Sequence, residues 1–307
     1  MAKMASTALS TIVMVLMFSM ACGAFLGCPT DHEITAEETA KQLELEEYFV
    51  GHTHLPFFKP IDDFVDNTAG LLGLQSNQFR YILGMFAMFP LALLHRLLPN
   101  NPTLKHLYTL SCGLFASLYC FGTNTVVPLG SAVLVFVLLK VSFGSDTDEK
   151  YVKKKWIPVA YFSLLLAILS GIHIHRMFID YGGYTLDISG PQMIITIKLC
   201  QVVWNVYDFR NKSEKYRHRN ANALDVKDLN LLSFLAYIFF FPGYLAGPAF
   251  EFQRYLAFTE LRDDYALEKR PSIAASLPSC FKKVVIALFF MFVTVVVAGY
   301  FNVNWML

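Results

Sequence analysis

Four polar side chains in a largely apolar stretch are spaced so that they could act together. Lys198, Gln201, Asn205 and Asp208 follow one another at steps of three, four and three residues. At about 100° per residue, these steps place all four on one face of a helix. If the helix lies in a membrane, polar groups are costly unless they face water or each other, so we expect this stripe to line a cavity in a helix bundle. The alternative is that the stripe joins neighbouring helices at an interface.

Two histidines, His173 and His175, lie close to Arg176 in a polar stretch that follows an apolar one. Residues two apart on a helix do not face each other, which argues against a shared metal ion, and no metal site is predicted. A histidine here could transfer a proton near neutral pH, or it could anchor a helix end at the lipid headgroups. The sequence contains no glycine-rich phosphate loop, GxSxG elbow or HExxH motif, so the mechanisms of soluble enzymes find no support.

The apolar stretch 229–250 is interrupted by Pro242, Gly243, Gly247 and Pro248. Proline and glycine at this density exclude a straight helix. Irregular backbone at membrane depth is tolerated only where it is buried in protein or lines a cavity, so we expect a broken segment that contributes to the same cavity as the stripe. The alternative is a proline-kinked helix that spans the membrane.

The composition defines the class of protein in which these residues must be positioned. The 307 residues are 55% hydrophobic and 16% charged, with a mean hydropathy of +0.45. Soluble domains carry about 25% charged residues, so we infer an integral membrane protein. A net charge of +1 gives no reason to expect binding to nucleic acid. The predicted fold class is all-α, a polytopic transmembrane helix bundle with a broken or re-entrant helix.

The chain divides into three predicted parts. Residues 1–30 are a signal peptide or an anchor helix, two alternatives that the sequence leaves open. Residues 31–78 form an acidic lumenal segment, and residues 79–307 form a partial transmembrane domain. In its first helix, Arg80 and Arg96 lie near enough to the ends to reach the headgroups. Helices are expected near 79–98, 107–121, 127–143, 157–172, 191–207, 229–250 and 284–301.

Basic residues in short loops set the orientation, because Lys and Arg stay on the cytoplasmic side. The loops 140–155, 208–228 and 251–283 are rich in Lys and Arg, whereas loop 173–190 contains only Arg176. We therefore place the first three loops in the cytoplasm and the fourth in the lumen. Both ends of the stretch 229–250 then face the cytoplasm, which favours a segment that enters the membrane and returns.

Three runs of residues contain short motifs that occur in a characteristic order. One run extends from His173-Ile-His175-Arg176 to Gly190-Pro191-Gln-Met193. The next contains Lys198 and Trp204-Asn205-Val-Tyr-Asp208, and the third is Tyr237-Ile-Phe-Phe-Phe241-Pro242-Gly-Tyr-Leu-Ala-Gly247-Pro248-Ala-Phe250-Glu251-Phe252. Together they resemble the lysophospholipid acyltransferases of the membrane-bound O-acyltransferase family. The similarity extends over about residues 68–307 and is most specific in 173–208 and 237–255.

The resemblance implies a multi-pass enzyme of the endoplasmic reticulum membrane. Such an enzyme moves a fatty acyl group from acyl-CoA, its co-substrate, onto the hydroxyl of a lysophospholipid, and it needs no bound cofactor. The family uses a histidine as base and an asparagine that assists it. Residues that match the family then line a substrate chamber: Lys198, Gln201, Trp204, Asn205, Asp208, Pro242, Gly247, Pro248 and Glu251.

The family's catalytic motifs lie after the last predicted helix, beyond Leu307, so no catalytic residue is assigned in this chain. We expect an amino-terminal fragment that is inactive by itself. The alternatives are a component of a membrane transporter, which the broken helix and polar stripe would suit, and a non-catalytic partner of a full-length acyltransferase. The sequence leaves headgroup preference, acyl-chain preference and oligomeric state open.

Overall fold

A computed structural model describes residues 40, 44, 58–72, 76–143, 156–179, 187–211, 224–262, 265–266 and 272–300. Within these ranges every regular element is a helix, which confirms the predicted all-α class. The chain forms two compact units. The larger comprises Leu43–Tyr181 and Thr185–Ala266, and the other contains α14 (Ile273–Tyr300). The predicted signal or anchor segment 1–30 lies outside the described residues.

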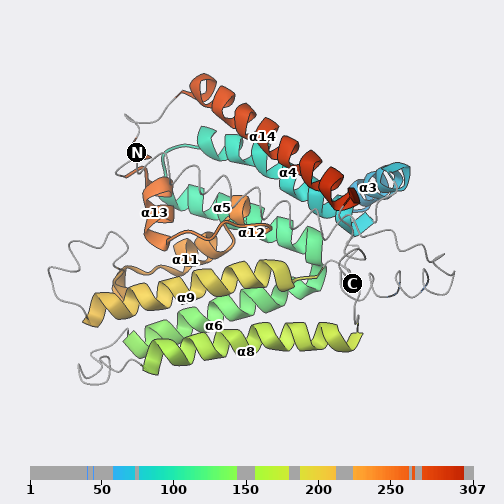
Figure 1. The fold of residues 1–307 in the computed structure, drawn as a ribbon. Coiled ribbons are helices and arrows are strands. Elements are labelled where there is room, and N and C mark those ends of the chain that lie inside the picture. The colour runs from blue at the N-terminus through green and yellow to red at the C-terminus, as the bar shows by residue number, and fades with distance from the viewer. Residues whose placement is uncertain are drawn as a thin grey trace. The chain divides into compact units, whose positions relative to one another are not determined.

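In the larger unit, α6, α8 and α9 pack side by side, and α5 packs against α4 and α11 (Figure 1). Two stretches of the described chain, Pro102–Phe143 and Trp156–Phe178, are long and apolar enough to cross a membrane. The elements are α3 (Lys59–Leu72), α4 (Ser76–Leu97), α5 (Pro102–Phe121), the 3₁₀ turn η1 (Gly122–Thr125), α6 (Val126–Phe143), α8 (Trp156–Ile179), α9 (Ser189–Asn211), the 3₁₀ turn η2 (Val226–Asp228), α11 (Leu231–Ile238), α12 (Phe241–Tyr244) and α13 (Phe252–Glu260).

The first apolar stretch is folded into a hairpin by η1. Its 42 residues would extend about 63 Å as one helix, against a hydrocarbon core of about 30 Å. Helix α5 starts at Pro102 and is capped by Asn101, whose side chain accepts a hydrogen bond of 3.0 Å from the Thr103 N–H. It ends where Gly122 adopts a positive φ of 54°, which favours glycine.

Two helices differ in length from the sequence-based boundaries. Helix α8 continues to Ile179 rather than ending near 172, because no glycine or proline interrupts residues 173–179. His173 and His175 are therefore on the helix and not in a loop. Helix α14 begins at Ile273 rather than near 284, after Ser272, whose hydroxyl accepts a hydrogen bond of 3.2 Å from the Ala275 N–H.

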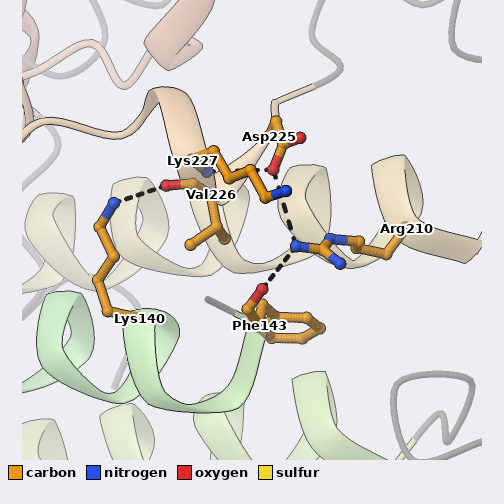
Figure 2. A network of polar contacts seen from close by, with 6 residues as sticks. All are labelled: Lys140, Phe143, Arg210, Asp225, Val226 and Lys227. Carbon is orange, nitrogen blue, oxygen red and sulfur yellow. Dashed lines mark hydrogen bonds and ion pairs between the residues drawn. The ribbon is translucent and has the colours of Figure 1, made fainter. Parts of the chain in front are cut away.

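The carboxyl ends of α6 and α9 are joined through the segment around η2 (Figure 2). Arg210 donates a 2.6 Å hydrogen bond to the carbonyl of Phe143, the last residue of α6, and lies 3.9 Å from the Asp225 carboxylate. Lys140 donates a 2.7 Å bond to the carbonyl of Val226. Cations at these positions satisfy carbonyls that a helix end or turn leaves unpaired. The network fixes the point where the chain turns into α11.

Replacing Arg210 with glutamine is expected to lower the stability by about 1 kcal/mol, because a charged hydrogen bond to a partly exposed carbonyl is lost. Thermal unfolding in detergent measures the change. The matched control is Lys227→Gln, because the Lys227 side chain is exposed and only its backbone N–H bonds Asp225. Equal effects of the two variants would contradict a structural role for the Arg210 network.

The segment from α11 to α13 enters the bundle along the α5–α6 hairpin. Phe234, in α11, packs against Phe136 of α6 with ring centroids 5.4 Å apart. Beyond the end of α11, the backbone at Phe239 lies directly against Gly113 of α5. The helix is interrupted here, and α12 begins at Phe241 with Pro242 in its first turn.

The same segment then returns to the end at which it entered. The Tyr244 hydroxyl lies 2.6 Å from the Ser117 hydroxyl, deep along α5. The Tyr255 hydroxyl, on α13, lies 2.8 Å from Nδ1 of His106, near the start of α5. His106 and Ser117 are eleven residues apart, or about 16 Å along the helix, roughly half the thickness of a bilayer core. The break predicted from the prolines and glycines is therefore confirmed, and the return of the chain supports the predicted re-entrant path.

Arg80 does not reach outward as its position near a helix end suggested. Its side chain is buried, donates a 3.0 Å hydrogen bond to the Asp62 carboxylate and lies 5.5 Å from the centre of the Tyr119 ring. Asp62 belongs to α3, which packs against α4 and covers this arginine. A carboxylate of the predicted acidic segment is thus buried as an ion pair instead of being solvated.

Candidate functional site

A groove of about 540 Å³ lies between α8, α9 and the residue that precedes α13. Residues of α9 that share one helical face form its longest wall, because they follow one another at steps of three and four along the chain. Side chains of α8 form the opposite wall, also at helical spacing. The lining consists of Phe162, Leu166, Leu169, Met193, Thr196, Ile197, Cys200, Gln201, Trp204, Asn205 and Glu251.

The groove is apolar along most of its length and polar at one end. The apolar part of the groove remains open in the larger unit, because Phe162 is 45% exposed, Met193 43% and Ile197 51%. From Met193 to Asn205 the wall extends about 18 Å along α9. At the polar end, Asn205 donates a 2.7 Å hydrogen bond to the Glu251 carboxylate. The groove thus matches an amphipathic molecule with one long apolar chain.

Two polar atoms on the α9 wall have no hydrogen-bond partner among the described residues. They are Oγ1 of Thr196, a residue only 5% exposed, and Oε1 of Gln201. A buried polar group without a partner costs about 1–3 kcal/mol.

The groove brings together four of the residues that the sequence singled out. Gln201, Trp204, Asn205 and Glu251 all contribute to its wall. Because α9 carries three of them, their proximity follows from helical spacing alone. Glu251 is 46 residues beyond Asn205 and reaches it only through the return of the re-entrant segment. Their role in a substrate chamber stays a prediction.

Lys198 lies beside the groove and not in its wall. Lys198 precedes Gln201 by three residues. At about 100° per residue, this spacing places Lys198 about 60° around the helix from Gln201, on the side that faces α11. The Lys198 ammonium is fully buried and donates hydrogen bonds of 3.1 and 3.2 Å to the carbonyls of Tyr237 and Ile238. These carbonyls end α11, where the helix dipole favours a cation. Lys198 therefore closes the broken end of α11.

The remaining predicted residues also lie outside the described lining. Pro242 is in α12, whereas Gly247 and Pro248 belong to the turn that carries Glu251, and Gly247 has a positive φ of 76°. This turn is held by hydrogen bonds of 2.6 Å from the Tyr81 hydroxyl to the Leu245 carbonyl and from the Tyr237 hydroxyl to the Phe250 carbonyl. Asp208 lies one turn beyond Asn205 and does not contact the groove.

The α8 wall and Thr196 were not singled out from the sequence. Apolar residues such as Phe162 and Leu166 carry no signal that separates a groove wall from a lipid-facing surface. Thr196 lies five residues before Gln201, which places it about 140° around α9, so the spacing of the polar stripe could not have found it.

The two histidines are not part of the groove. His173 is half-buried and His175 is exposed, both on α8. Across the described part of the chain, no three His, Cys, Asp or Glu side chains are grouped so as to hold a metal ion.

Comparison with known proteins gives a family match over part of the chain. Residues 174–306 match the model of the membrane-bound O-acyltransferase family. A lysophospholipid acyltransferase of Schizosaccharomyces pombe is 28% identical over 221 residues, which cover 70% of this chain and 42% of that protein. Lysophospholipid acyltransferase 6 of Drosophila melanogaster is 28% identical over 224 residues, or 71% of this chain and 29% of that protein.

A third similar protein is membrane-bound glycerophospholipid O-acyltransferase 2 of Gallus gallus, 29% identical over 175 residues, or 55% of this chain and 31% of its own length. The matched region of the chain thus spans less than half the length of these relatives. The family match includes the α9 wall, the re-entrant segment and Glu251. The chain is a membrane protein, and the match over residues 174–306 agrees with the resemblance to the membrane-bound O-acyltransferase family.

Proposed function

We propose that this protein takes part in the transfer of a fatty acyl group from acyl-CoA to the hydroxyl of a lysophospholipid, and that the groove holds the acyl chain of the acceptor lipid. The observation that carries the proposal is the amphipathic groove, apolar along α9 and polar at Asn205 and Glu251. The names of the relatives support the reaction. A lysophospholipid has the matching form, with one acyl chain and one polar headgroup.

In this reaction the acceptor hydroxyl oxygen attacks the thioester carbonyl carbon. An ester C–O bond forms, the C–S bond breaks, and the hydroxyl proton ends on the sulfur of free CoA. A thioester is reactive enough that a positioned base and a donor for the developing oxyanion suffice. The groove residues orient the acceptor lipid, and none of them is assigned as the base.

We place the protein in the endoplasmic reticulum membrane as a multi-pass protein. The apolar α5–α6 hairpin and α8 support several crossings. The packing also supports the predicted alternation of loops, because the carboxyl ends of α6 and α9 lie together (Figure 2). The basic loops 140–155 and 208–228 would then share the cytoplasmic side.

Filling the groove tests the proposed function. Replacing Ile197 with tryptophan is expected to weaken binding of a lysophospholipid at least about tenfold, because the larger side chain occupies the path of the acyl chain. Binding of a fluorescent lysophospholipid to the purified protein in detergent measures the change. Ile197 is half-exposed, so the fold should accept the substitution.

The matched control is Val137→Trp, which adds the same bulk to α6 at a residue that is 50% exposed and outside the groove lining. It should bind lysophospholipid as the unmodified protein does. Unchanged binding by the Ile197→Trp variant would refute the groove as the acceptor site.

A further inference from the structure

Helix α3 exposes apolar side chains that its packing against the bundle leaves uncovered. Leu71 is 87% exposed, Phe64 57% and Ile61 37%. At about 100° per residue, these three lie within about 80° of one another around the helix. Single exposed apolar residues are common on any protein, but three on one face of a 14-residue helix form a continuous apolar surface.

The rest of α3 divides into two further faces, one buried against the bundle and one polar and exposed. The buried face consists of Asp62, Val65 and Ala69, and the polar face consists of Asp63, Asp66 and Asn67. The centres of the three faces are about 120° apart around the helix. Helix α3 thus presents one side to protein, one to water and one apolar side to a third environment.

Thr68 lies among the exposed apolar residues, and a local hydrogen bond reduces its polarity. The Thr68 hydroxyl donates a 2.7 Å bond to the carbonyl of Phe64, one turn earlier in the same helix. A threonine hydroxyl that bonds the preceding turn does not need water as its partner. The whole of this face therefore suits an apolar environment.

Helix α3 lies at the level where the α5–α6 hairpin leaves the membrane core. The 20 residues of α5 extend about 30 Å, enough to cross the core once, and the chain turns at η1 directly afterwards. Tyr119, in the last turn of α5, contacts Phe58, which precedes α3, with ring centroids 5.2 Å apart. Phe58 also contacts Phe115, which is 46% exposed on the hairpin. Helix α3 therefore borders the surface that the hairpin presents to lipid.

We propose that α3 binds the bilayer surface, with Ile61, Phe64 and Leu71 inserted among the headgroups and the upper parts of the acyl chains. A helix with one apolar and one charged face lies in the plane of the interface, with its apolar face about 5–10 Å deep. Because the loop 140–155 is placed in the cytoplasm, η1 at the other end of α6 is lumenal, and α3 binds the lumenal leaflet. Part of the predicted acidic segment is then a membrane-surface helix, independent of the groove.

Two features of α3 define how it meets this surface. The buried hydrogen bond between Arg80 and Asp62 fixes the rotation of α3 about its own axis, so the apolar face stays directed away from the bundle. Asp63 and Asp66 are exposed on the polar face, and an anionic lipid surface would repel them. The surface that fits α3 is therefore one of electrically neutral lipids such as phosphatidylcholine.

The test adds one tryptophan to α3 and measures fluorescence quenching in phosphatidylcholine vesicles, with the signal of the three native tryptophans subtracted. Quenching by lipid brominated on its upper acyl chains reports contact with lipid, and quenching by iodide on both sides of the vesicles reports contact with water. Phe64→Trp should lose about half of the added fluorescence to brominated lipid and little to iodide. The matched control is Asp66→Trp, about 160° away around the helix, which should be quenched by iodide and not by brominated lipid.

Leu71→Trp gives a second variant in case Phe64→Trp alters folding, because Leu71 is almost fully exposed, and it should repeat the result of Phe64→Trp. Quenching of Phe64→Trp and Leu71→Trp by iodide instead of brominated lipid would overturn the proposal, since α3 would then lie in water. Protection of both from both quenchers would overturn it as well, because protein would then cover the apolar face. Quenching of Asp66→Trp by brominated lipid would show that α3 does not lie with its polar face towards water.

Discussion

Replacing Gly113 with alanine should destabilise the protein by about 3 kcal/mol, the upper range for forcing an extra methyl group into a packed interior. Gly113 is buried in α5, where the backbone of Phe239 passes directly over it. A Cβ there would overlap the Phe239 carbonyl group, 2.8 Å from its carbon. The clash is with backbone, so no side-chain rotation relieves it, and the re-entrant segment would have to move away from α5.

The matched control is Gly130→Ala in α6, where a Cβ would meet no atom within 4 Å. Alanine favours the helix there by up to about 1 kcal/mol, so this variant should be as stable as the unmodified protein or slightly more stable. Thermal unfolding in detergent, followed by near-UV circular dichroism, compares the two. A Gly113→Ala protein as stable as Gly130→Ala would show that the segment does not lie against α5 at this point.

Replacing Arg80 with methionine should cost about 3–5 kcal/mol, because it removes the arginine that pairs with the buried carboxylate of Asp62. The side chains of Arg80 and Asp62 are 6% and 9% exposed, and their closest atoms are 3.0 Å apart. The same substitution also removes the cation from the Tyr119 ring. The free energy of unfolding in detergent measures the loss.

An ion pair with an exposed arginine supplies the control. Arg262 pairs with Glu260 but its side chain is 63% exposed, so Arg262→Met should change the stability by less than about 1 kcal/mol. Adding Asp62→Leu to Arg80→Met should recover much of the loss, because no charge then remains buried. If the double variant is no more stable than Arg80→Met alone, the cost comes from lost packing and not from the buried charge of Asp62.

The amino-acid sequence by itself determined the class of fold and half of the groove. Its apolar content required a membrane protein, and Pro242 with Gly247 required that the helix around them break. The steps between Gln201 and Asn205 required a shared helical face, because helix geometry is local and depends only on residue spacing. The short motifs at 173–208 and 237–255 were sufficient to indicate the family.

Only the tertiary structure decided which partner each of these faces meets. Glu251 contacts Asn205 because the segment after α11 turns back beside α9. Lys198, on the edge of the same stripe, instead meets the broken end of α11, and Asp62 of a segment expected to be solvated is buried against Arg80. Periodicity defines the direction of a side chain around its own helix. It contains no information on which distant residue of the chain packs opposite that side chain. The identity of that residue decides whether a polar group lines a groove or caps a helix end.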